Sequence, residues 1–110
     1  MKTSNVIAAL AALAQESRLA IFRALVQAGP DGLSAGKIGE IIGITPSSVS
    51  FHMKELTRAD MVTSRHKGRF VIYMASFAMI NGLVAFLTEN CCGGEPCGVC
   101  VPEGVERATA

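Results

Sequence analysis

The sequence predicts a mainly helical α+β domain, with elements in the order helix, helix, helix, helix, strand, strand, helix. Three observations predict this class. Apolar residues recur at helical spacing near both ends of the first 90 residues. Gly and Pro divide the middle of the chain into short segments. Two short runs rich in β-branched and aromatic residues lie on either side of Lys67-Gly68.

Length and composition set the outer limits. The chain has 110 residues, which is the size of one domain. Half of its residues are apolar and only 17% are charged, which excludes a disordered chain. This composition predicts more apolar surface than a small monomer can bury, which favours a homodimer. No apolar run reaches the roughly 18 residues of a membrane helix, so we expect a cytoplasmic protein without a membrane partner.

The first two helices are expected over residues 4–15 and 17–28. Val6, Leu10 and Leu13 recur at helical spacing in the first of them. The second is followed by Gly29-Pro30-Asp31-Gly32, a sequence that ends helices.

Two short helices follow, over residues 35–42 and from Thr45-Pro46 to Arg58. Ser34 can cap the first, and Gly43 supplies the left-handed residue that ends it. Thr is a good N-cap, and Pro is favoured at the first helical position. The apolar residues expected to face inward are Ile38, Ile41 and Ile42 in the first helix and Val49, Met53 and Leu56 in the second.

A short helix, a glycine turn and a capped second helix form a helix-turn-helix. A β-hairpin is expected next, with strands Met61–His66 and Phe70–Ala75 around Lys67-Gly68, which makes the motif winged. Residues 76–90 are expected to form the last helix. We therefore divide the chain into a winged helix-turn-helix domain over 1–90 and a cysteine-rich tail over 91–110.

Positive charge gathers in the second helix of the motif and the hairpin. Between Pro46 and Ala75 there are five basic and two acidic residues, a net charge of +3 within a chain of +1. This distribution is typical of a surface that binds double-stranded DNA. His52 is expected to be partly buried in this helix. The residues predicted to contact DNA are Ser47, Ser48, Ser50, Phe51, Lys54, Arg58, Arg65, Lys67 and Arg69.

All four cysteines lie in the tail, at positions 91, 92, 97 and 100. A disulfide scaffold would spread its cysteines along the chain, so we interpret the cluster as a thiol site in a reducing cytosol. The α-carbons of Cys91 and Cys92 are about 3.8 Å apart, so both sulfurs can reach one ion. Thiolates select soft metals, and a Cys-x-x-Cys pair also oxidises readily. An enzyme is not expected, because Cys91 and Cys92 follow a helix C-terminus, which raises a thiol pKa.

Two stretches carry a resemblance to a known family: LAQESRLAIF over residues 13–22 and IGEIIGITPSSVSFHMKEL over residues 38–56. With the hairpin, they resemble the ArsR/SmtB family of metal-responsive bacterial repressors, over about residues 5–90. The resemblance implies a homodimer that represses a resistance operon when metal-free and releases DNA when metal binds. It implies joining through the first and last helices, where the candidate interface residues are Val6, Ile7, Leu10, Ile80, Val84 and Leu87.

Members of the ArsR/SmtB family carry their metal ligands in different parts of the chain. Some members carry Cys-Val-Cys before the recognition helix, where this chain has Ser34-Ala35-Gly36. Others bind zinc along the last helix, which here lacks His and Asp. Some arsenic-responsive members have a Cys-Cys pair after the last helix, as here. This implies As(III) or Sb(III) as effector on Cys91 and Cys92 with Cys97 or Cys100, and no organic cofactor. Cadmium, lead or zinc binding and thiol oxidation stay as alternatives.

Overall fold

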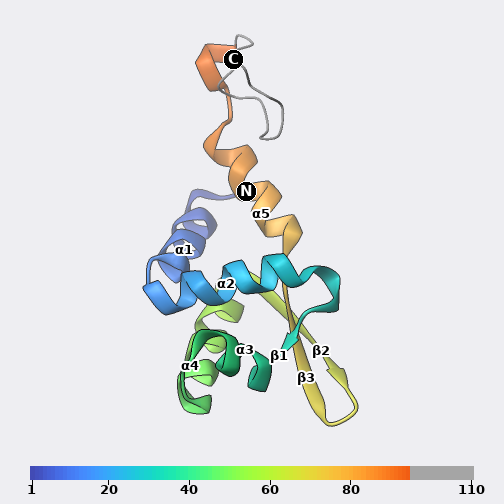
Figure 1. Cartoon of the computed structure of the whole chain (residues 1–110). Coiled ribbons are helices and arrows are strands. Elements are labelled where there is room, and N and C mark those ends of the chain that lie inside the picture. Colours follow the sequence, from blue (N-terminus) through green and yellow to red (C-terminus); the bar gives the residue numbers. More distant parts are fainter. Residues whose placement is uncertain (95–110) are drawn as a thin grey trace, which may run out of the picture.

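The computed structural model of the chain describes residues 1–94. Figure 1 shows α5 leaving one end of the body and the β2–β3 hairpin extending from the other. The elements are α1 (Thr3–Leu13), α2 (Glu16–Ala28), the 3-10 turn η1 (Gly29–Asp31), β1 (Leu33–Ser34), α3 (Ala35–Ile42), α4 (Pro46–Arg58), β2 (Val62–Lys67), β3 (Phe70–Ala75), α5 (Phe77–Leu87) and the 3-10 turn η2 (Cys91–Gly94).

The predicted class and order of helices and hairpin are confirmed, and the differences lie at the ends of elements. α1 ends two residues earlier than expected, because Gln15 is extended and its side chain accepts a hydrogen bond from the Arg18 amide at 2.8 Å. Gln15 thereby caps α2. The last helix is also shorter than the expected 76–90, since Ser76 caps it and Asn90 lies beyond its end with φ 56°.

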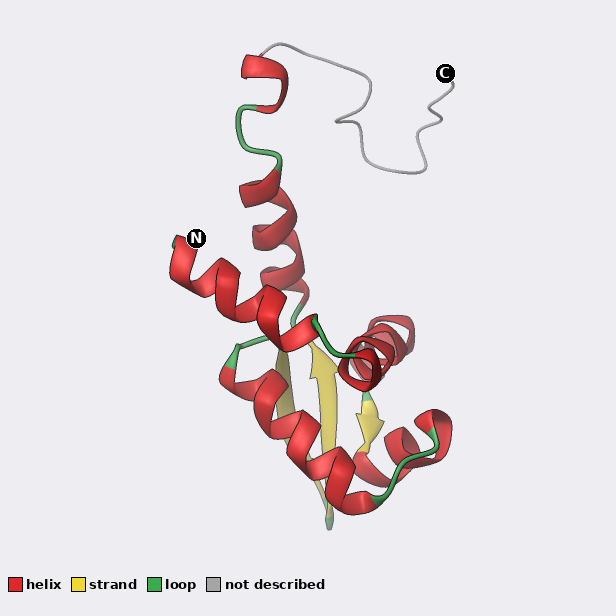
Figure 2. Ribbon diagram, turned by 90° about the vertical axis from the view of Figure 1, so that its left-hand side faces the viewer, coloured by secondary structure: helices red, strands yellow, loops and turns green. Residues whose placement is uncertain are grey.

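The short strand β1 was not expected, because two residues are too few to show an alternating pattern. β1 pairs with β3, so the sheet has three antiparallel strands in the order β1-β3-β2. Lys67 pairs with Phe70, so the hairpin loop is Gly68-Arg69 rather than Lys67-Gly68. Figure 2 shows the helices gathered around this sheet.

The core lies where α2, α3 and α4 meet the base of the hairpin. Ile21, Leu25, Ile38 and Leu56 are fully buried there, together with Met61 just before β2. The core therefore fixes α4 against the rest of the domain through the stripe predicted from the sequence, since Val49 and Met53 are also buried.

One inward-facing prediction in α3 is wrong. Ile38 is buried and Ile42 is half-buried, but Ile41 is 50% exposed. A helix of two turns offers one narrow face to its neighbours, and here residues four apart define that face. Ile41 lies one position before Ile42, so its side chain points to a different side of the helix and faces solvent.

Within residues 1–94 no helix on its own has the length and apolar character needed to cross a bilayer. α1 combined with residues 16–31 passes that test only as a pair bent by 102°.

Candidate nucleic-acid interface

α4 begins as the sequence predicts. Its N-cap Thr45 accepts a hydrogen bond from the Ser48 amide at 3.2 Å, and Pro46 follows at the first position. Gly43, with φ 80°, ends α3 in the left-handed conformation. These local signals set the angle at which α4 leaves the turn, because the helix axis starts at the cap.

The exposed side of α4 carries the predicted DNA-contacting residues of this helix. Ser47, Ser50, Phe51 and Lys54 are exposed, opposite the buried stripe. Ser48 is half-buried and its hydroxyl accepts a hydrogen bond from the Thr45 hydroxyl at 3.1 Å. Ser48 therefore contributes to the cap, and the open surface consists mainly of the other four side chains.

The hairpin has two different faces because side chains alternate along a strand. Ser64 and Tyr73 are partners in the β2–β3 register, and both line a groove with α4. Lys67, Phe70 and Ile72 instead line a hollow on the other side with Ser34 of β1. Ser64 and Tyr73 thus share a hollow with α4, and Lys67 does not line that hollow.

The groove between α4 and the hairpin has a volume of about 480 Å³. It contains three hydroxyl residues that the sequence analysis did not select: Thr57, Ser64 and Tyr73. Strand alternation from the predicted hairpin would have put Ser64 and Tyr73 on one face, but only the packing shows which face meets α4. The lining residues are Ser50, Met53, Lys54, Thr57, Arg58, Ser64 and Tyr73.

Two of the predicted DNA-contacting arginines are engaged within the chain. Arg65 donates from Nη1 to the Pro30 carbonyl at 3.1 Å and from Nη2 to the Asp31 carbonyl at 3.3 Å, which ties the hairpin to η1. Arg58 forms an ion pair with Glu55 at 3.1 Å. Lys67 and Arg69 are exposed at the hairpin tip, and across residues 1–94 neither forms an ion pair.

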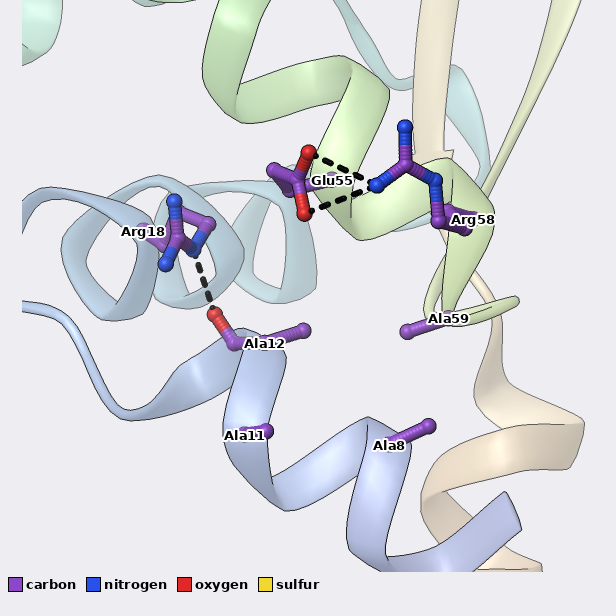
Figure 3. Close-up of a pocket in the computed structure, with 7 residues that line it drawn as sticks. All are labelled: Ala8, Ala11, Ala12, Arg18, Glu55, Arg58 and Ala59. Carbon is purple, nitrogen blue, oxygen red and sulfur yellow. Dashed lines mark hydrogen bonds and ion pairs between the residues drawn. The ribbon is translucent and has the colours of Figure 1, made fainter. Parts of the chain in front are cut away.

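Arg18 of α2 links α1 to α4, a role that was not predicted from the sequence. Its Nε donates to the Ala12 carbonyl at 2.7 Å, and its Nη1 lies 3.2 Å from His52 Nδ1. Figure 3 shows Arg18 beside a pocket of about 210 Å³ where α1 and α4 face each other, with Glu55 and Arg58 on the α4 side. Arg18 therefore joins the end of α1 to the middle of α4.

His52 is half-buried, as expected. Its ring meets the exposed Phe51 ring edge-on, with the two ring centroids 5.5 Å apart. Burial lowers the pKa of His52 from its usual 6.5, and the nearby Arg18 charge lowers the pKa further. The neutral ring can accept the hydrogen bond from Arg18 at Nδ1.

The candidate interface residues on α1 and α5 are exposed with two exceptions. Ile7, Leu10, Val84 and Leu87 are 60, 42, 55 and 59% exposed, and Ile80 is half-buried. Val6 is only 4% exposed, so it packs inside its own chain and offers little surface to a partner. Val6 lies three residues before Ala9, which is fully buried, and so shares the inward face of α1.

The first two cysteines follow α5 in the turn η2. Their own sulfur atoms lie 3.7 Å apart, and each cysteine is disulfide-bonded, which differs from the thiol form expected. Cys97 and Cys100 lie outside the described residues. Within residues 1–94, no group of three His, Cys, Asp or Glu side chains is close enough to hold a metal ion.

A capped recognition helix on a helix-turn-helix, followed by a hairpin with cations at its tip, defines a winged-helix DNA-binding protein. Comparison with known proteins narrows this class. The family described as "Helix-turn-helix domain" matches residues 13–65. The arsenical resistance operon repressor of Bacillus subtilis is 35% identical over 81 residues, which cover 74% of this chain and 73% of that protein. The chain belongs to the ArsR family of transcriptional regulators.

One further relative is also a transcriptional regulator, and one solved structure shares the fold. An uncharacterized HTH-type transcriptional regulator of Bacillus subtilis, YceK, is 41% identical over 58 residues, which cover 53% of this chain and only 57% of that relative. An ArsR-like transcriptional regulator from Rhodococcus sp. RHA1 has the same fold, with a TM-score of 0.70 and 24% identity over 83% of this chain and 82% of that one. The two Bacillus subtilis relatives are named as a transcriptional regulator and a repressor, and neither name describes an enzyme.

Proposed function

We propose that this DNA-binding regulator is a repressor that binds operator DNA as a homodimer and releases it when As(III) or Sb(III) binds the C-terminal cysteines. The proposed ligands are Cys91 and Cys92 with Cys97 or Cys100. The proposed DNA contacts are Ser47, Ser50, Phe51 and Lys54 on α4 and Lys67 and Arg69 on the hairpin. The other three predicted residues act indirectly: Ser48 through the cap of α4, Arg58 through its ion pair with Glu55, and Arg65 through its hydrogen bonds to η1.

The observation that carries the effector proposal is the closeness of the Cys91 and Cys92 sulfur atoms, four residues beyond the end of α5. Two sulfurs that each bind one soft ion at about 2.3 Å lie no more than about 4.6 Å apart. The observed separation of 3.7 Å is within that limit. Because each cysteine is disulfide-bonded here, binding would start from the reduced protein.

Homodimerisation is supported by the apolar faces of α1 and α5. Ile7, Val84 and Leu87 are each more than half exposed, and exposed apolar surface of this kind is typical of a protein–protein contact. A two-fold homodimer that buries these side chains would carry two recognition helices, matching an operator with two-fold symmetry.

The proposed release follows from continuity between α5 and the cysteines. Only three residues separate Leu87 from Cys91. Drawing the cysteines together would change the end of α5, and a shift at the dimer interface would change the spacing of the recognition helices. A coupling free energy of about 1–3 kcal/mol would lower DNA affinity about 5- to 150-fold.

The test is fluorescence anisotropy of the reduced protein on DNA from upstream of its own gene. We expect arsenite or antimonite to release the DNA and zinc to have no effect. Cys91→Ser/Cys92→Ser protein should bind DNA with unchanged affinity and stay bound when arsenite is added. Release of DNA from this double variant by arsenite would contradict the proposed site.

A second candidate is a repressor of the same fold that senses thiol oxidation. The observation favouring it is that Cys91 and Cys92 are disulfide-bonded in the structure. In that case peroxide would change DNA affinity, a reductant would restore it, and arsenite would have no effect. Release by zinc, cadmium or lead in place of arsenite would instead indicate another soft metal.

A further inference from the structure

The groove between α4 and the hairpin has an unusual chemical composition. Four of its lining residues carry hydroxyl groups, two are cationic, and none carries a carboxylate: Ser50, Thr57, Ser64, Tyr73, Lys54 and Arg58, with Met53 at the base. In residues 1–94, two other hollows contain Glu side chains, and a third, at the hairpin tip, has two cations but only one hydroxyl residue. A concave surface with many donors and no acid favours an extended anionic ligand.

The donors of this groove are available. In the described part of the chain, no side-chain hydrogen bond or ion pair engages Lys54 or any of the four hydroxyls. Arg58 is the exception, since it pairs with Glu55. Tyr73 is half-buried at the sheet wall, with Ser64 opposite it in the register. Thr57 is on α4, and Ser64 and Tyr73 are on paired strands, so the backbone positions of these three donors are set before a ligand arrives.

We propose that this groove holds the phosphodiester backbone of one DNA strand, and that Tyr73, Ser64 and Thr57 donate hydrogen bonds to its phosphates beside Lys54. The assignment rests on the proposed docking of α4 against duplex DNA and adds three residues to it. Hydroxyl contacts to phosphate fix the position of a protein on the duplex without reading sequence.

The position of the groove supports backbone contact over base contact. Its five α4 residues are spaced along one face toward the C-terminal end of the helix: Ser50, Met53, Lys54, Thr57 and Arg58. The N-terminal residues of a recognition helix are those that approach base edges. A strand that leaves the major groove between helix and wing would pass between the Lys54 and Tyr73 walls.

The chain offers a direct spectroscopic probe of this site. It contains a single Tyr and no Trp. Protein made with 3-fluorotyrosine therefore has one ¹⁹F resonance, which comes from residue 73. We expect saturating duplex DNA of arbitrary sequence, at low salt, to shift this resonance. A resonance that does not move while anisotropy shows full binding would overturn the proposal.

Affinity for the same duplex gives an independent test. Tyr73→Phe keeps the ring and should weaken binding about 3- to 10-fold through one lost hydrogen bond, with an unchanged salt dependence. Ser64→Ala should act similarly. Its matched control is Thr63→Ala, the neighbouring strand residue on the opposite face, which should bind like wild type. Lys54→Ala should weaken binding and reduce the slope of log K against log salt by about 0.9.

The outcomes separate this inference from the proposed function. If Lys54→Ala weakens binding but Tyr73→Phe and Ser64→Ala match wild type, the hydroxyl contacts are wrong and the docking of α4 stands. If wild-type protein binds no duplex at all, the proposed function itself fails. Equal losses in Thr63→Ala and Ser64→Ala would show that the hairpin is merely destabilised, which also overturns the assignment.

Discussion

Gly32 occupies a position where no side chain fits. Its φ is +69°, and a Cβ there would lie 2.7 Å from Ile72 Cγ2 and 2.8 Å from Met74 Cγ, besides meeting the Tyr73 carbonyl oxygen. We expect Gly32→Ala to destabilise the fold by about 3–5 kcal/mol, as measured by urea unfolding. Gly68→Ala is the matched control, because Gly68 has φ +63° but nothing within 4 Å, and should lose only about 1 kcal/mol. Equal losses would show that φ alone matters.

The contact between His52 and Arg18 predicts a dependence of stability on pH. The pKa of His52 is lowered from 6.5, so in mild acid the unfolded chain binds a proton at this ring that the folded chain does not. The unfolded state then binds more protons, and stability falls as pH falls below 6.5 and through the lowered pKa.

His52→Asn keeps an acceptor toward Arg18 and cannot titrate. We expect this variant to lose less stability than wild type between about pH 7 and about pH 5, in parallel urea titrations. His66→Asn, which changes the other His of the chain, serves as the control for the loss of a histidine. If His52→Asn and wild type follow the same pH profile, the Arg18 contact does not depend on the charge of the ring.

At the scale of elements, the start of α4 depends on Thr45. Its hydroxyl accepts from the Ser48 amide and also lies 3.3 Å from the Ser47 hydroxyl. We expect Thr45→Ala to cost about 1 kcal/mol in urea unfolding and to weaken DNA binding, because the first turn of the helix frays. Thr45→Ser should retain both, since it keeps the capping oxygen. A Thr45→Ala variant with wild-type stability would show that Pro46 alone sets the helix start.

Elements with local signals could be predicted from the sequence. Ser34, Gly43 and Thr45-Pro46 act on their own neighbours, and α3 and α4 have the expected bounds. β1 could not be predicted, because a two-residue strand forms only when β3 is beside it. The ends of α1 and α5 were missed for a related reason, since the caps and turns beyond them compete with the apolar pattern.

The candidate site was predictable in part for the same physical reason. The exposed side of α4 follows from its helical period, so Ser50, Phe51 and Lys54 were found. The partners of Arg65 in η1 and of Arg18 in α4 depend on contacts between residues 34 or 35 positions apart. Tyr73 lines the groove with α4 because that face of the sheet packs toward the helix. No local sequence pattern predicts which face of the sheet does so.

At the scale of the whole molecule, the apolar faces of α1 and α5 predict the oligomeric state. Each Val or Leu side chain buried between protomers contributes about 1.5–3 kcal/mol. We therefore expect Val84→Asp/Leu87→Asp to raise the dimer dissociation constant about 100-fold or more, as measured by analytical ultracentrifugation.

The control for the dimer prediction is Ile41→Asp. Ile41 is 50% exposed, close to the 55% of Val84, but it lies on α3 away from α5. This variant should sediment like wild type. A wild-type protein that is monomeric at micromolar concentration would contradict the proposed homodimer, and with it the route from the cysteines to the recognition helices.

The two-residue strand β1 has a consequence for building chimeric regulators. Leu33 and Ser34 pair with Tyr73 and Ile72 of the hairpin, and the Ser34 hydroxyl also accepts from the Lys37 amide at the start of α3. The pair α3–α4 is therefore joined to the β2–β3 hairpin through β1. Transplanting α3 and α4 alone into another scaffold would break this pairing, so β1 and the hairpin must be transferred with them.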